Sequence, residues 1–85
     1  MSKIILDASD AIKLAKKLHQ FDISTIGFTA AEEMVNDFLN TVETIDRFNR
    51  IAAGTQFGMN IGMSAKSVEV EEETMTWICV ILERI

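Results

Sequence analysis

The chain of 85 residues contains no proline and no tyrosine, and histidine and cysteine occur only once each. A single cysteine cannot form a disulfide within the chain, which favours a reducing compartment. His19 ends an apolar helical pattern and Cys79 lies among apolar residues, so we interpret both as structural. No motif brings together a nucleophile, a base or a set of metal ligands. We therefore expect a protein that is not an enzyme and that holds no cofactor and no metal ion.

Long hydrophobic runs are missing as well. The apolar stretch Ile4–Leu6 is too short for the core of a signal peptide, and Asp7 ends it. The longest stretch without a charged residue, 51–65, is shorter than the ~20 residues of a membrane-spanning helix and includes polar side chains. We therefore expect a cytoplasmic protein that does not bind membranes.

Positive charge is scarce: the chain has 8 basic and 13 acidic residues, and its net charge is −5. The first 28 residues have a small basic surplus, whereas 29–50 and 51–85 each hold five acids against two bases. Such a surface repels phosphate groups, so direct binding of nucleic acid is not expected. The partner that this charge fits is another protein with a basic surface.

The hydrophobic fraction of 48% suffices for a packed core, and the length predicts one domain over residues 1–85. The longest predicted element is a helix at 29–54, whose apolar residues recur at helical spacing along one side. Thr29 and Glu32 fit a capping box at its start, and Gly54 suits its end. The apolar side contains Ala31, Met34, Val35, Phe38, Val42, Ile45, Ala52 and Ala53.

Two elements are predicted before this helix. Lys3–Leu6 is rich in isoleucine and predicts a short strand. Asp7 or Ser9 can then cap a helix that runs to about Gln20. Residues 21–28 are expected to form a packed connection with at most a brief extended piece. The buried side of the helix is expected to contain Ala8, Ala11, Ile12, Ala15 and Leu18.

After Gly54 the apolar period changes from helical to alternating. Residues 57–63 and 66–71 each alternate large apolar residues with small, polar or acidic ones, which predicts two strands with one face in the core. The spacing of glycines by four residues keeps a helix open as an alternative for 54–62, and a loop is the other. Thr74–Glu83 is predicted as a last strand with apolar residues on both faces.

The predicted fold class is α+β, with two helices packed on a small, mainly antiparallel sheet in the order strand–helix–helix–strand–strand–strand. Two helices can cover only one face of this sheet. Met75, Trp77 and Ile81 are expected on the uncovered face of the last strand, where they would form the interface of a homodimer. The alternative is that Trp77 faces the helices and the other face is only partly exposed.

Glu72 and Glu73 are expected in a tight connection before the last strand. If Glu69, Glu71 and Glu73 all lie on one strand, they form a row of carboxylates with neighbours ~6.6 Å apart. This spacing is too wide for one metal ion. The row either guards the sheet against aggregation or docks on a basic surface of a partner. A basic helix face of Lys13, Lys16 and Lys17 is interpreted as solvated or as loosely paired with the acidic side of the long helix. Binding of a phosphate or an acidic peptide is the alternative.

The sequence therefore predicts a small acidic intracellular protein-binding module, non-enzymatic and homodimeric, which acts as an inhibitor or adaptor by occupying a partner surface. The alternative is a sensor or sequestering protein for a small ligand. Its pocket would lie near 54–62, where glycines allow close approach, although no P-loop or dinucleotide motif is present. The pocket residues would be Phe57, Gly58, Met59 and Gly62.

Overall fold

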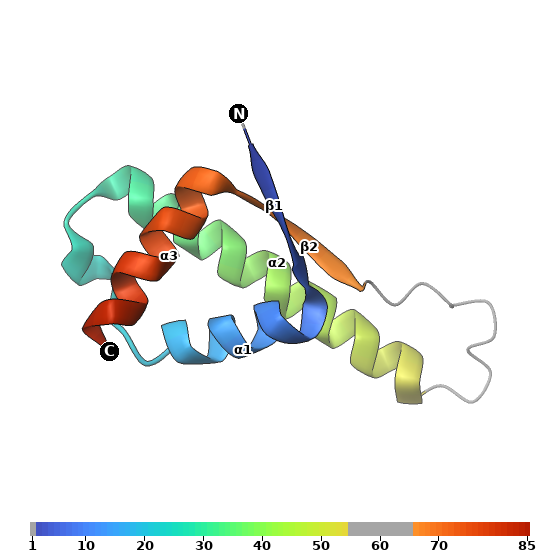
Figure 1. The fold of residues 1–85 in the computed structure, drawn as a ribbon. Coiled ribbons are helices and arrows are strands. Elements are labelled where there is room, and N and C mark those ends of the chain that lie inside the picture. The colour runs from blue at the N-terminus through green and yellow to red at the C-terminus, as the bar shows by residue number, and fades with distance from the viewer. Residues whose placement is uncertain (1, 55–65) are drawn as a thin grey trace.

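A computed structural model describes residues 2–54 and 66–85. In these residues the chain is α+β, as predicted, with a two-stranded antiparallel sheet packed on helices (Figure 1). The elements are β1 (Lys3–Asp7), α1 (Ala8–Leu18), the 3-10 helix η1 (Ile23–Ile26), α2 (Thr29–Gly54), β2 (Ser67–Glu71) and α3 (Glu72–Arg84). The predicted order with three consecutive strands at the end is not found, and the strand predicted at 57–63 lies outside the described residues.

The sheet joins the two ends of the chain. Ile4 of β1 lies opposite Val70 of β2, and Leu6 lies opposite Val68. Because paired residues of an antiparallel sheet share a face, these four side chains form its inner face. Val68 and Val70 are each only 4% exposed there. The alternation of valine and glutamate in the sequence therefore predicted the buried face of β2 correctly.

Each strand leads directly into a helix with the same local backbone. The N-cap residues are Asp7 (φ −60°, ψ 140°) for α1 and Glu71 (φ −60°, ψ 142°) for α3, and neither makes a side-chain capping bond. The other strand supplies the acceptor instead. The N–H of Ala8 donates to the carbonyl of Lys66 (2.8 Å), and the N–H of Glu72 donates to the carbonyl of Ser2 (3.1 Å). The β1-α1 and β2-α3 units are thus two similar halves around one antiparallel pair.

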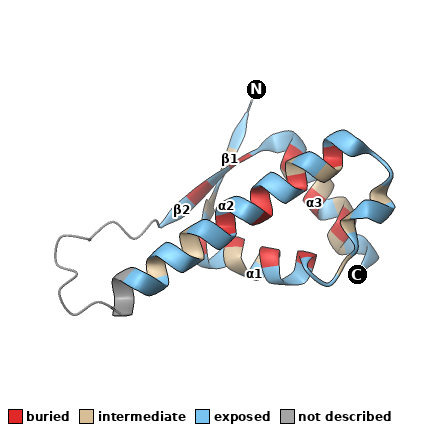
Figure 2. Ribbon diagram, turned by 180° about the vertical axis from the view of Figure 1, so that it is seen from behind, coloured by how far each residue is buried: buried red, intermediate tan, exposed pale blue. Residues whose placement is uncertain are grey.

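The core lies where the inner face of the sheet meets the three α-helices, and Figure 2 shows the buried residues along their inward sides. The buried residues of α1 include three alanines, and this side of the helix packs on α2. Leu18, Val35, Ile78 and Ile81 are the largest fully buried side chains. The remaining members of the core cluster are Ala11, Ala15, Phe38, Leu39, Val42, Val68 and Val70.

The predicted strand Thr74–Glu83 is wrong, because these residues belong to helix α3. Thr74, Ile78 and Ile81 are buried at a spacing of one helical turn each, which is the inward face of a helix. A short apolar run does not distinguish a buried strand from a buried helix by its period alone. The signals that favour a helix are at its ends, since two acids occupy the first turn and Arg84 the last, which suits the helix dipole.

The connection between α1 and α2 is packed, as expected, but it contains η1 in place of an extended piece. The carboxylate of Asp22 accepts bonds from the N–H (3.1 Å) and the hydroxyl (2.6 Å) of Ser24 and so caps η1. Gly27 ends it with a φ of 82°, which a residue with a side chain rarely adopts. The N–H of Glu32 then donates to the carbonyl of Phe28 (3.0 Å). Helical bonding therefore starts one residue before Thr29, the predicted cap.

Ile78→Ala is expected to lower the free energy of unfolding by about 2–5 kcal/mol, because it leaves a cavity where the side chain is completely buried. Ile5→Ala is the matched control. Its side chain is exposed on the outer face of the sheet, so the change should stay within about 0.5 kcal/mol. Urea denaturation measures both values. Equal losses in the two variants would contradict the assignment of the core.

Candidate functional site

The outer face of the sheet is the most clearly uncovered part of the fold. Ile5 is 67% exposed there, opposite Glu69. The ammonium of Lys3 lies 3.7 Å from a carboxylate oxygen of Glu69 and 3.9 Å from one of Glu71. Both pairs are exposed, so each contributes little to stability. With Asp7 on the same face, three carboxylates surround one ammonium and one apolar side chain.

The acidic row predicted from the sequence is divided between two elements. Glu69 and Glu71 lie on β2 and face outwards, whereas Glu73 lies in the first turn of α3 beside Glu72. The row required all three glutamates to lie on one strand, and this condition is not met, because β2 ends at Glu71, where the backbone turns into the helix. The negative charge nevertheless continues from the strand into the helix without an intervening base.

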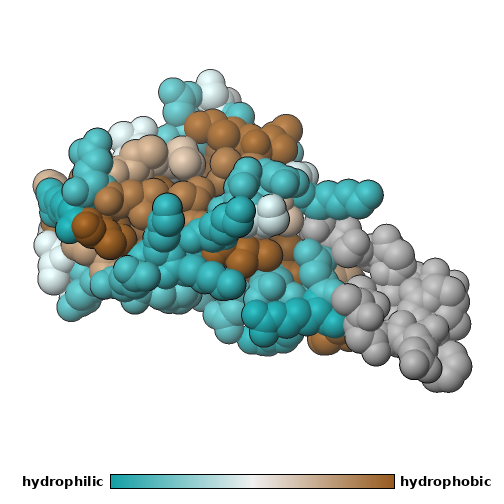
Figure 3. Space-filling view, turned by 60° about the horizontal axis from the view of Figure 1, so that its bottom comes forward, coloured by the Kyte–Doolittle hydropathy of each residue, from teal (hydrophilic) through white to brown (hydrophobic). Residues whose placement is uncertain are grey.

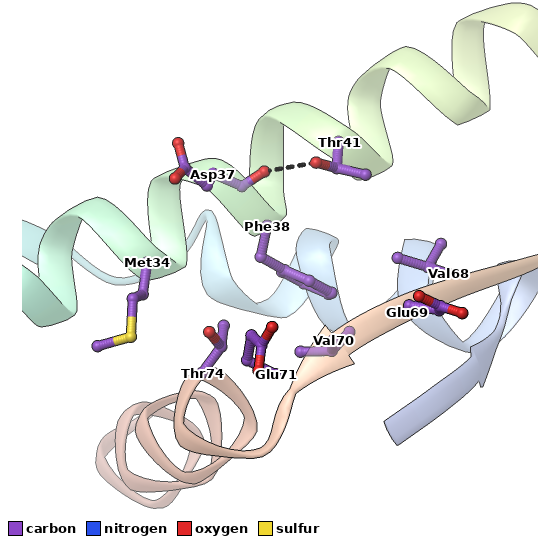
Figure 4. A pocket seen from close by; sticks show the side chains of 9 residues that line it. All are labelled: Met34, Asp37, Phe38, Thr41, Val68, Glu69, Val70, Glu71 and Thr74. Atoms are coloured by element: carbon purple, nitrogen blue, oxygen red, sulfur yellow. Dashed lines mark hydrogen bonds between the residues drawn. The ribbon is translucent and has the colours of Figure 1, made fainter. Parts of the chain in front are cut away.

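A groove runs beside β2, on the edge that faces away from β1 (Figure 4). Its volume is about 230 Å³. Met34 and Phe38 of α2 and the valines of β2 give it an apolar floor, and Thr74 of α3 lies at one end. The complete lining is Met34, Asp37, Phe38, Thr41, Val68, Glu69, Val70, Glu71 and Thr74. This groove was not predicted, because it depends on how α2 crosses β2.

Thr74 is an unusual member of this lining. The residue is only 7% exposed, and its hydroxyl bonds to no described residue. Thr41, Thr44 and Thr76, by contrast, each donate to a carbonyl four residues earlier in their helix. The hydroxyl of Thr74 is thus left to interact with whatever enters the groove.

Backbone groups also face this groove. In an antiparallel sheet, residue pairs that are joined by hydrogen bonds alternate with pairs that are not. The bonds from Ala8 to Lys66 and from Glu72 to Ser2 fix this alternation, so that the two valines of β2 belong to bonded pairs. Val68 and Val70 therefore direct their N–H and C=O groups towards β1. Ser67, Glu69 and Glu71 direct theirs to the opposite edge, beside the groove. Except for the carbonyl of Glu71, which accepts the first bond of α3, these groups bond to no other described backbone group.

The three apolar residues predicted for a dimer interface are not brought together. Ile81 is 1% exposed and belongs to the core. Met75 and Trp77 are half-buried, and two residues of a helix separated by ~200° point to opposite sides. Trp77 instead packs against Phe28, with ring centroids 5.4 Å apart and an interplanar angle of 44°. Phe28 is 61% exposed, so this aromatic pair reaches the surface.

The two residues with reactive side chains lie apart. His19 is the C-cap residue of α1, and its N–H donates to the carbonyl of Ala15 (3.0 Å). Cys79 is exposed on α3, so its interpretation as core filling was wrong. The two residues line different hollows of the surface. Residues 2–54 and 66–85 contain no group of three or more His, Cys, Asp or Glu placed to hold a metal ion.

The basic face of α1 is exposed, as the solvated interpretation requires. Lys13, Lys16 and Lys17 make no ion pair with a described residue. Two acids of α2 pair within their own helix, Glu43 with Arg47 (3.0 Å) and Asp46 with Arg50 (2.7 Å). Figure 3, which brings the lower side of Figure 1 forward, shows hydrophilic side chains interspersed with smaller hydrophobic areas.

The pocket predicted at Phe57, Gly58, Met59 and Gly62 lies outside the described residues. Within the described part of the chain, no helix combines the length and the apolar character needed to cross a membrane.

The described residues thus define a small acidic α+β fold whose two-stranded sheet leaves its outer face and the edge of β2 open. The chain matches no protein-family model, no curated protein and no solved structure.

Cys79 is expected to react with a thiol reagent in the native protein almost as fast as in the unfolded chain, because its side chain is exposed. Absorbance of the released chromophore in buffer and in urea compares the two rates. Cys79→Ser provides the blank. Slow labelling in buffer that urea accelerates greatly would show that the thiol is protected.

Proposed function

We propose that the chain is a non-enzymatic protein-binding module that acts as an inhibitor or adaptor by docking on a basic surface of another protein. One observation carries this proposal: an uncovered sheet face on which exposed Ile5 is surrounded by Asp7, Glu69 and Glu71. An apolar centre with a charged rim is the usual composition of a protein interface. The surrounding carboxylates select a partner of opposite charge.

The shape and the charge of the sheet together favour a protein partner over DNA. A two-stranded ribbon is narrow enough to enter the major groove of DNA. On this ribbon, however, Lys3 is the only base among the side chains of the outer face, against three acids. Phosphates would be repelled. The same ribbon suits a positively charged groove of a protein, such as one that itself binds nucleic acid, and occupying that groove would inhibit the partner.

Reversing both charges of β2, with Glu69→Lys and Glu71→Lys, is expected to weaken binding of a dye-labelled oligolysine about tenfold or more at low salt. The unaltered protein should lose affinity as salt screens the attraction. Fluorescence anisotropy at several salt concentrations measures this, and duplex DNA is not expected to bind.

The matched control reverses two other exposed acids, with Glu33→Lys and Glu43→Lys. It changes the net charge equally, but these residues lie on the side of α2 that lines a different hollow, next to η1. The control should keep most of the affinity. Equal losses in both double variants would show that only the net charge matters and would contradict a specific docking face.

We also propose that the module is a homodimer. The support comes from the aromatic pair of Phe28 and Trp77, which places an exposed ring on the surface. Aromatic side chains are enriched at the centres of interfaces, and two-fold dimers are the commonest assemblies of soluble proteins. Ile81 belongs to the core and therefore takes no part in the dimer interface proposed here.

Phe28→Ser is expected to convert the dimer into a monomer at micromolar concentration, because it removes an exposed ring without opening the core. Phe48→Ser is the control, since that ring is also exposed, at 42%, but lies much further along α2. Sedimentation velocity distinguishes the species. If the unaltered protein sediments as a monomer, homodimerisation through this pair is wrong.

A further inference from the structure

We infer that the free edge of β2 binds an extended, basic segment of the partner, which adds to the sheet as a third strand. This inference rests on the proposed protein-binding function and specifies how the partner is held. Main-chain bonds along a sheet edge supply affinity in this mode of recognition, and alternate side chains supply specificity.

The edge presents a regular set of backbone groups that bond to no described residue. The N–H groups of Ser67, Glu69 and Glu71 and the carbonyls of Ser67 and Glu69 face away from β1. The carbonyl of Glu71 is excluded, because the N-cap residue of a helix already accepts the first helical bond. An added strand would therefore satisfy these groups without breaking any bond of the described sheet.

The groove beside this edge provides a floor for the added strand. Neighbouring strands lie ~4.8 Å apart, so a third strand next to β2 would lie over Met34, Phe38 and Thr41 of α2. The volume of about 230 Å³ is below the ~300–1,000 Å³ of typical small-molecule pockets, and it suits a few side chains of a peptide. The unpartnered hydroxyl of Thr74 offers a hydrogen bond at one end.

The two faces of the sheet impose an alternating pattern on the segment. Side chains that point inwards meet the apolar surface of Met34 and Phe38 and should be apolar. Side chains that point outwards lie ~5 Å from Glu69 and Glu71 and should be lysine or arginine. The ion pairs of Lys3 with these two carboxylates are long and exposed, so a lysine or arginine of the added strand can easily take the place of Lys3.

The free edge of β1 is less suited to this role. Its outward-facing charged residues are Lys3 and Asp7, which have opposite signs and select no charge in a partner. The charged residues of β2 are both acidic, and the apolar floor and the hydroxyl of Thr74 lie beside its edge. The site therefore belongs to β2.

The first test uses a short dye-labelled peptide of alternating lysine and valine and two N-methylated forms of it. In one form every lysine nitrogen is methylated, and in the other every valine nitrogen. Only one of the two sets of N–H groups can face β2, so one form should lose affinity about tenfold or more and the other should bind nearly as well as the parent. The two forms carry the same side chains and the same charge.

If both methylated forms bind as tightly as the parent peptide, the strand is not formed and the inference is overturned. The proposed function would survive that result if the charge-reversed variant, with Glu69→Lys and Glu71→Lys, still failed to bind the parent peptide. If the parent peptide does not bind at all, both proposals fail.

The second test is hydrogen exchange of the β2 amides. In the free protein the N–H groups of Ser67, Glu69 and Glu71 should exchange fast, whereas those of Val68 and Val70, bonded to β1, should be protected. Saturating peptide should slow the three fast amides about tenfold or more, because each then enters a ladder bond.

Slow exchange of these three amides without peptide would overturn the inference, because another occupant would already hold the edge. If the protection of these amides increases with protein concentration, a second copy of the chain occupies the edge. Protection independent of concentration would indicate the chain's own residues 57–63, and their replacement by a glycine–serine stretch should then release it.

Discussion

The pairing of β1 with β2 is the constraint on which the rest of the structure depends. It joins the first and last thirds of the chain and fixes the starting points of α1 and α3 at opposite ends of one ribbon. Neither helix has a side-chain cap, and each obtains its first acceptor from the opposite strand. The same pairing orients the inner face of the sheet towards the helices and leaves the acidic face outside.

Helix α2 gives this arrangement its asymmetry. The β1-α1 and β2-α3 units are alike, but α2 packs on both α1 and α3 and extends past the edge of β2. The groove lies where Met34, Phe38 and Thr41 of α2 face β2. An open edge, an apolar floor and carboxylates are thus combined on one side of the ribbon, whereas the β1 side has charges of both signs.

Much of the fold could be predicted from local patterns. The spacing of apolar residues predicted the bounds of α2, the burial of the alanines of α1 and the inward face of β2. The failure at Thr74–Glu83 has a physical cause, since both faces of that segment are apolar over a length at which strand and helix patterns overlap. The acidic Glu72 and Glu73 were interpreted as a tight connection between strands, although acids are also typical of the first turn of a helix.

The candidate site was only partly predictable. Alternation placed Glu69 and Glu71 outside, but the groove depends on contacts between α2, β2 and α3, which no local pattern encodes. The interface predicted at Met75, Trp77 and Ile81 assumed a strand, and the helix instead divides these residues among the core and two sides of α3.

The distance along the chain between the paired strands has a consequence for synthesis on the ribosome. β1 emerges first, with Ile4 and Leu6 on the face that needs a partner, and β2 emerges only after α1 and α2 have left the exit tunnel. Until then the apolar side of the first strand has nothing to pair with, although the helices can already form locally. The nascent chain is therefore most vulnerable to association with other molecules before β2 emerges, and the pairing of β2 with β1 is the event that completes the sheet.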